Sequence, residues 1–269
     1  RTLAQALKEA GYKTALVGKW QLGHAKPEMW PMQRGFDYFY GTIIGAGSFY
    51  NPNTLTRGND NIEHEAENDP SFFYTDAISD QAASYIRQHR QENPDEPFFH
   101  YVAYTAPHWP LHAHDGDIAK YKGRFDAGWD RLREQRLKRL VDDGILHPNW
   151  QLTDRDPTQP PFDEAKHREW TLRCMEVYAA QIDRMDQGIG RILQALEETG
   201  QMENTLIIFL SDNGACAEDI PEGVTARELV DQLMIAKAKT RKGEPVQFGN
   251  DPTLMPGGEH TYQSYGTAW

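Results

Sequence analysis

Short apolar runs and apolar stripes at helical spacing alternate along the chain. Three runs predict buried strands, over residues 15–17, 98–104 and 206–210. Stripes at helical spacing predict helices that end near Gly11 and that cover about 76–91, 120–141 and 163–199. Strands that alternate with helices are typical of an α/β fold, so we expect a mainly parallel sheet covered by helices on both faces.

Residues 21 to about 70 break this alternation. They are rich in Gly, Pro, Asn and aromatic residues, and we interpret them as a long, ordered loop. Its part Gly45–Asn61 is expected to shape a substrate pocket. Arg57 within it could contact a second anionic group, although a solvated loop arginine is the simpler interpretation.

Composition narrows the class of protein. The formal charge is −12, from 40 acidic and 28 basic residues, which argues against nucleic-acid binding because the phosphate backbone would be repelled. No apolar run approaches the length that spans a bilayer, so no membrane partner is expected. The two cysteines, Cys174 and Cys216, form no disulfide framework and have no zinc-site spacing, so we interpret them as ordinary thiols.

Polar residues follow each predicted strand. Lys19 follows the first strand, His108 the second, and Asp212 and Asn213 the third. Ligands of open α/β sheets gather beyond the carboxyl ends of the strands, where these side chains could meet. Asp and Asn offer oxygen ligands for a hard cation, while Lys and His suit an oxyanion and its leaving oxygen. The pattern favours transfer of a phosphoryl or sulfuryl group. Taken singly, each residue also fits a plain turn or a solvated loop.

Several segments carry a family resemblance. TLAQALKEAGYKTALVGKWQLG…RGFDYFYG, FFHYVAYTAPHWPLHA and VYAAQIDRMDQGIGRILQALEETGQMENTLIIFLSDNGA occur in the order of the matching blocks of type I, formylglycine-dependent sulfatases, as does TYQSYGTAW. The chain resembles a bacterial arylsulfatase-like member over nearly its whole length. The resemblance implies an alkaline-phosphatase-like fold, a sulfuric ester hydrolase activity and, for most bacterial relatives, a periplasmic or secreted location.

The resemblance also implies roles for the strand-end residues. Lys19 would bind the sulfate and contact the nucleophile, and His108 would bind sulfate and protonate the leaving alkoxide. Asp212 and Asn213 would be metal ligands, to Ca²⁺ or alternatively Mg²⁺. The substrate would be an aryl sulfate or a carbohydrate (glycan) sulfate ester.

Two departures limit these roles. Neither Cys174 nor Cys216 lies in the C/S-x-P-x-R motif in which the family forms formylglycine, so the 269 residues are interpreted as the central part of a catalytic domain, with the nucleophile segment and the C-terminal part outside it. Gln21 stands where the family has a histidine that acts as a base, and glutamine accepts no proton near neutral pH. His24 is one substitute base.

These departures leave several functional interpretations open. Gln21 fits a natural variant with another base, a degenerate sulfatase, or an introduced change that traps an intermediate. This chain alone is expected to be inactive. The alternatives to a sulfatase are a catalytically impaired pseudo-sulfatase that acts as a binding module, and a phosphate or phosphonate ester hydrolase of the same superfold.

Overall fold

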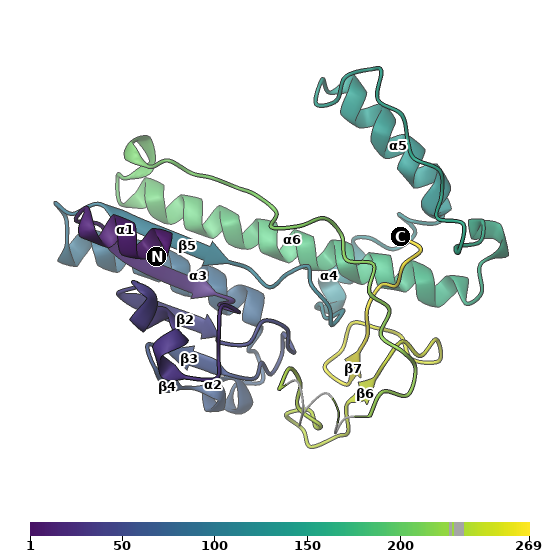
Figure 1. Ribbon diagram of the computed structural model, residues 1–269. Coiled ribbons are helices and arrows are strands. Elements are labelled where there is room, and N and C mark those ends of the chain that lie inside the picture. Colours follow the sequence, from purple (N-terminus) through teal and green to yellow (C-terminus); the bar gives the residue numbers. More distant parts are fainter. Residues whose placement is uncertain (226–227, 229–233) are drawn as a thin grey trace.

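The computed structural model describes residues 1–225, 228 and 234–269 and contains a mixed five-stranded sheet (Figure 1). Its strand order is β4 (Asp60–Asn61), β3 (Leu55–Arg57), β2 (Tyr38–Thr42), β1 (Lys13–Gly18), β5 (Phe98–Ala103). β1 runs parallel to both β2 and β5, whereas β3 is antiparallel to β2 and to β4. A separate parallel pair joins β6 (Gln247–Phe248) to β7 (Thr261–Tyr262). The predicted α/β class is confirmed, with a parallel centre and an antiparallel edge.

Helices cover both faces of the sheet, as predicted. The α-helices are α1 (Leu3–Glu9), α2 (Glu63–Asn68), α3 (Tyr74–Glu92), α4 (Asp115–Ala119), α5 (Gly128–Asp142) and α6 (Arg168–Glu198). Short 3₁₀ turns lie at Pro27–Met29, Pro31–Arg34, Phe162–Glu164 and Met202–Asn204. α1 begins with a capping box between Thr2 and Gln5 and is followed by Gly11 at φ +89°.

Alternation along β1 divides the core into two layers. Leu16 points to the α1 face, where it packs with Phe39 and Phe36. Val17 points to the opposite face, where it packs with residues of α3 such as Ile78. α6 then lies against α3, with Met185 and Ile192 contacting the α3-side core. A strand buried on both faces explains why 15–17 is an uninterrupted apolar run.

The structure corrects two predicted elements. The region 21–70 is not a plain loop, because it contains β2, β3, β4 and α2. The aromatic run Tyr38–Thr42 pairs with β1 and was missed because it is short and interrupted by Gly41. The basic helix expected at 120–141 begins later, at Gly128, and ends at Asp142. Figure 1 shows this helix, α5, projecting away from the rest of the molecule.

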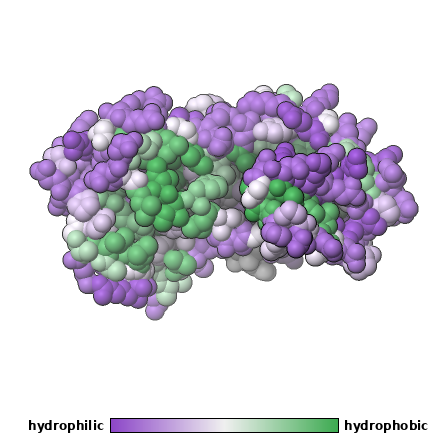
Figure 2. Space-filling model, turned by 90° about the horizontal axis from the view of Figure 1, so that it is seen from above, coloured by the Kyte–Doolittle hydropathy of each residue, from purple (hydrophilic) through white to green (hydrophobic). Residues whose placement is uncertain are grey.

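The third predicted strand is wrong for this structure. Residues 205–210 form no strand, and the apolar side chains of 206–210 are open to solvent. The exposed fractions are Leu206 86%, Ile207 50%, Ile208 72%, Phe209 76% and Leu210 70%. In Figure 1 this segment runs along the upper side of the molecule. Figure 2 shows the molecule from above, and this face carries a broad hydrophobic area. A strand forms only where a partner accepts its hydrogen bonds, and the described residues pair none with this run.

No helix of the described residues is long and apolar enough to cross a membrane.

Candidate functional site

Lys19 is held at the carboxyl end of β1 by backbone hydrogen bonds to both neighbouring strands. Its N–H donates to the Ala103 carbonyl at the end of β5 (2.8 Å), and the next N–H, of Trp20, donates to the Thr42 carbonyl of β2 (2.9 Å). Gly18 makes this possible, because a Cβ there would lie 2.0 Å from the Ala103 oxygen. The half-buried Lys19 side chain therefore leaves the sheet at a fixed point.

His108 stands on the turn that follows β5. Its N–H donates to the Thr105 carbonyl (2.9 Å), and its ring Nδ1 lies 2.7 Å from the Trp109 carbonyl oxygen. A carbonyl accepts only, so Nδ1 carries the proton and Nε2 is the nitrogen left to exchange one. Burial lowers the pKa of His108, and the charge of Lys19 lowers it further, against the hydrogen bond to Trp109.

Asp212 brings a negative charge to the same place. Burial lowers the pKa of Lys19, and the Asp212 carboxylate opposes that effect. Asp212 also acts to raise the pKa of His108. The Asp212 charge therefore acts on both Lys19 and His108, which follow the paired strands β1 and β5, although the segment 205–210 that precedes Asp212 is not a strand.

Asn213 lies beside Asp212 in an exposed turn. Its Nδ2 donates to the Gly214 carbonyl (2.7 Å), and its own carbonyl accepts from the Ser211 hydroxyl (2.6 Å). This is the local hydrogen bonding of an ordinary turn. The metal-ligand role of Asn213 stays a prediction. We refer to Lys19, Gln21, His108, Asp212 and Asn213 together as the strand-end site.

Gln21 joins the strand-end site through Gly45. Gln21 is exposed, has φ +52°, and its N–H donates to the Ile43 carbonyl (3.1 Å). A Cβ built on Gly45 would lie 2.1 Å from Gln21 Oε1 and 2.6 Å from Lys19 Cε. Both side chains thus lie against the same glycine, and the base role expected at the position of Gln21 stays a prediction. His24 lies on the exposed loop beyond, with its carbonyl accepting from the Trp30 indole (3.0 Å).

The described residues do not form a complete metal site. Asp212 and Asn213 offer oxygens of the kind that Ca²⁺ or Mg²⁺ takes, but Ca²⁺ needs about six to eight of them. Within the described part of the chain, no group of three or more His, Cys, Asp or Glu side chains could hold an ion. The donor set fits a hard cation in kind and falls short in number, so we derive no reaction step through a metal.

The cysteines take no part in the strand-end site. Cys174 is fully buried in α6, and burial raises the pKa of its thiol, which keeps it protonated and inert. Cys216 follows the Asp212 turn, and its Sγ accepts from the Glu218 N–H (3.4 Å). Arg57 forms a paired hydrogen bond with Glu65 (2.7 and 3.0 Å), so its charge is already matched and is not directed at a second anion.

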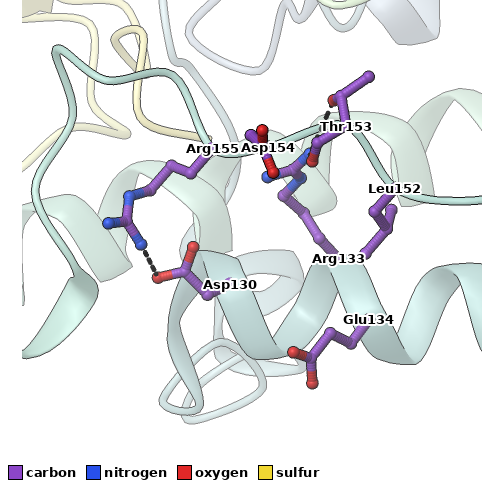
Figure 3. Close-up of a pocket in the computed structure, with 7 residues that line it drawn as sticks. All are labelled: Asp130, Arg133, Glu134, Leu152, Thr153, Asp154 and Arg155. Carbon is purple, nitrogen blue, oxygen red and sulfur yellow. Dashed lines mark hydrogen bonds and ion pairs between the residues drawn. The ribbon is translucent and has the colours of Figure 1, made fainter.

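One cavity of the structure lies away from the strand-end site. It measures about 480 Å³ and lies on α5 and the segment after it (Figure 3). Its two arginines are already engaged: Arg155 donates to Asp130 (2.9 Å), and Arg133 donates to the Thr153 carbonyl (2.8 Å). The converging charges of Lys19, His108 and Asp212, and not this cavity, define the candidate site.

Sequence reasoning missed three residues of the site. Gly45 supports Lys19 and Gln21, the Trp109 ring lies 4.6 Å from the His108 ring, and Glu218 accepts from the Trp109 indole (3.2 Å). Trp109 directly follows His108 in the quoted TAPHWP segment, so its place next to a candidate site residue could have indicated it. Gly45 was included only as the first residue of the segment expected to shape a pocket, and no pattern in the sequence pointed to Glu218.

Comparison with known proteins establishes the family. The sulfatase family model matches residues 1–261, and the chain belongs to the sulfatase family. It is 31% identical to an uncharacterized sulfatase of Schizosaccharomyces pombe over 99% of this chain and 48% of that protein. It is 35% identical to an arylsulfatase of Klebsiella aerogenes over 80% of this chain and 47% of that protein. The chain thus spans about half the length of these relatives.

Solved structures give a weaker likeness. The crystal structure of Ps i-CgsB in complex with a neocarrahexaose matches with a TM-score of 0.48 and 24% identity, over 74% of this chain and 36% of that one.

Proposed function

We propose that the complete protein hydrolyses sulfate esters, and that the strand-end site of this chain binds and protonates the substrate. The observation that carries the proposal is the position of Lys19 and His108 just after the paired strands β1 and β5, and the charge of Asp212, which acts on both, supports it. Membership of the sulfatase family supports sulfate over phosphate as the group transferred. An aryl or carbohydrate sulfate is the proposed substrate, the first in line with the name of the Klebsiella relative.

Two residues do identifiable chemistry in this proposal. The Lys19 ammonium, half-buried at the end of β1, binds the sulfate oxygens and offsets negative charge as the S–O bond breaks. His108 carries a proton on Nδ1 that the Trp109 carbonyl holds in place. Its Nε2 then delivers a second proton to the leaving alkoxide or aryloxide, which needs an imidazolium at the start of the step.

Asp212 and Asn213 are proposed as two of the ligands of a hard cation, Ca²⁺ in the first place and Mg²⁺ as the alternative. When bound, the cation would neutralise charge on the sulfate group. Asp212→Ala is expected to remove calcium binding by the complete protein, measured by titration calorimetry. Unchanged calcium affinity in this variant would remove Asp212 from the ligand set.

The nucleophile is proposed to be formylglycine, supplied by residues outside the 269 of this chain. The buried Cys174 supports this assignment, since it cannot reach a substrate. A periplasmic or secreted location remains part of the same proposal.

The decisive experiment compares two substrates on the complete enzyme. We expect turnover of 4-nitrophenyl sulfate to exceed that of 4-nitrophenyl phosphate, and both to depend on His108, tested with His108→Gln. Faster turnover of the phosphate ester would instead identify a phosphate ester hydrolase.

Gln21 favours a second candidate, a sulfatase that is impaired after the first step. Glutamine stands at the sequence position where the family resemblance implies a base, and its amide lies close to Gly45, as does the Lys19 side chain. Mass spectrometry of the complete enzyme after incubation with substrate would detect a retained sulfo group in that case, and Gln21→His would release it. Steady turnover with no retained sulfo group would rule out impairment.

A further inference from the structure

Trp109 connects His108 to a carboxylate that no motif of the sequence includes. The indole ring of Trp109 lies 4.6 Å from the His108 ring on one side and 5.8 Å from the buried Tyr262 ring on the other. Its Nε1–H donates to Glu218 Oε2 at 3.2 Å. The carbonyl of the same residue holds His108 Nδ1. Trp109 therefore contacts the imidazole through both its main chain and its side chain.

Glu218 is itself anchored at the main chain. Its carbonyl accepts from the Ser264 hydroxyl (3.0 Å), and the neighbouring Ala217 carbonyl accepts from the Thr267 hydroxyl (2.9 Å). Ser264 is buried, and its backbone N–H donates to Asn250 Oδ1 (2.8 Å). The segment that bears Glu218 is thus held against the C-terminal part of the chain. The backbone from which the exposed Glu218 carboxylate extends is therefore fixed.

Three charged side chains influence the protonation of His108. Lys19 at the end of β1 disfavours the imidazolium, while Glu218 and Asp212 favour it. From α6, the uncharged Gln181 amide donates to the His108 carbonyl (3.4 Å) and the Pro110 carbonyl (3.2 Å). Among these groups Glu218 alone is also joined by a hydrogen bond to the residue that orients the imidazole. A proton donor to a leaving group needs both a fixed direction and a retained proton.

We propose that Glu218 is a positioning residue for His108, acting through the Trp109 indole on the orientation of the ring and through its charge on the retention of its proton. This rests on the proposed function, in which His108 protonates the leaving group. Glu218 does not contact the substrate. Its effect on the same reaction is exerted on His108 and passes through Trp109.

Two variants of Glu218 separate the hydrogen bond from the charge in the complete enzyme. Glu218→Ala removes both and is expected to lower kcat roughly tenfold, the effect of losing one charged hydrogen bond, with KM nearly unchanged. Glu218→Gln keeps an oxygen acceptor for the indole, so kcat on the low-pH plateau stays near that of the unmodified enzyme. Both variants move the alkaline limb of the kcat profile to lower pH, because the imidazolium loses its neighbouring anion. Since Glu218 is exposed, that movement should shrink in concentrated salt.

Trp109→Phe tests the connection. It removes the indole N–H, so adding Glu218→Ala to it should change kcat on the low-pH plateau no further. Glu222→Ala, at an exposed carboxylate of the same segment, is the matched control and should leave kcat and its pH profile unchanged. Independent, multiplying losses in the double variant would show that Glu218 does not act through Trp109 and would overturn the proposal.

A readout without turnover separates this proposal from the proposed function. NMR titration of ¹³C-labelled histidine in the complete protein, with the His108 signal assigned by its loss in His108→Gln, should show a lower His108 pKa in Glu218→Gln. An unchanged pKa together with an unchanged kcat profile would overturn the role of Glu218. Absence of sulfate ester hydrolysis in the unmodified enzyme, with the NMR shift present, would instead overturn the proposed function.

Discussion

β1 and the segment 205–210 have similar sequences and opposite environments. Ala15, Leu16 and Val17 are fully buried, with strands on both sides and helices on both faces. The apolar residues 206–210 are each at least half exposed, with no paired strand among the described residues. Each run leads into a polar part of the strand-end site, Lys19 in one case and Asp212 with Asn213 in the other. An apolar run becomes a strand through its neighbours and not through its own composition.

The difference has a consequence for the two halves of the site. Lys19 is placed by hydrogen bonds from β5 and β2, whereas Asp212 is carried by a turn whose hydrogen bonds are local. The sheet side of the site is therefore built by tertiary structure. The Asp212 side follows an apolar run that is open to solvent and has no such support from the sheet.

The largest expected effect tests the sheet side. Lys19→Ala in the complete enzyme is expected to lower kcat/KM for an aryl sulfate by about 10²–10³-fold or more, as for the loss of a group that stabilises transition-state charge. Steady-state kinetics measure it. Lys26→Ala, at an exposed lysine of the following loop, is the control and should leave kcat/KM unchanged. Comparable losses in both variants would mean that the position at the end of β1 is unimportant.

The second prediction contrasts the two apolar runs directly. Leu16→Ala is expected to lower the free energy of unfolding by about 2–5 kcal/mol, because it opens a cavity in the core. Phe209→Ala is expected to change it by less than about 0.5 kcal/mol, since that side chain is 76% exposed. Urea unfolding followed by circular dichroism compares them. A large cost for Phe209→Ala would show that the run is covered in solution, which would end the contrast.

The third prediction concerns the loss of folding stability in acid, to which the buried histidines His100 and His112 contribute. Burial lowers the pKa of His100 in β5 to about 3 and that of His112 to about 4. Both rings are therefore neutral when folded, and the unfolded chain binds their protons first as the pH falls below about 6.5. The stability that they contribute is complete above that pH and is lost as the pH falls toward 4 and 3, on the order of 3 kcal/mol for His112.

His112→Gln isolates one of these contributions. His112 accepts from the Phe49 N–H (3.3 Å) and lies 2.6 Å from the Thr261 carbonyl, and a glutamine amide can make both bonds without titrating. Urea midpoints between pH 7 and 4 should fall less steeply in this variant. His64→Gln, at an exposed histidine, should keep the original slope. Identical slopes in all three proteins would refute the buried neutral His112.

The smallest effect concerns Gly45, which lies close to the side chains of both Lys19 and Gln21. Gly45→Ala places a methyl group against flexible ends of both side chains, so they shift and kcat falls about tenfold, roughly 1.4 kcal/mol in the barrier. Unfolding should change little. Gly116→Ala, in α4 and in open space, is the matched control. An unaffected kcat in Gly45→Ala would show that the glycine does not set the Lys19 position.

Several elements could be predicted because their signals are local. The stripes of α3 and α6 and the buried runs of β1 and β5 follow from periodicity, and the observed bounds differ by only a few residues for most of them. β2 was missed because five residues that include a glycine carry little periodicity. It becomes a strand by pairing with β1, and Gly41 is required there because a Cβ would lie 1.8 Å from the Gly18 oxygen.

By itself the sequence determined the α/β class, the polar residues that end the runs, and the sulfatase family. Periodicity, strand-end chemistry and motif order all lie within single segments, so one chain is enough to read them. Only the tertiary structure decided that Gly45 supports Lys19 and Gln21, that Glu218 reaches Trp109, and that 205–210 stays outside the sheet. These outcomes depend on contacts between residues far apart in the chain, whose energies no local pattern contains.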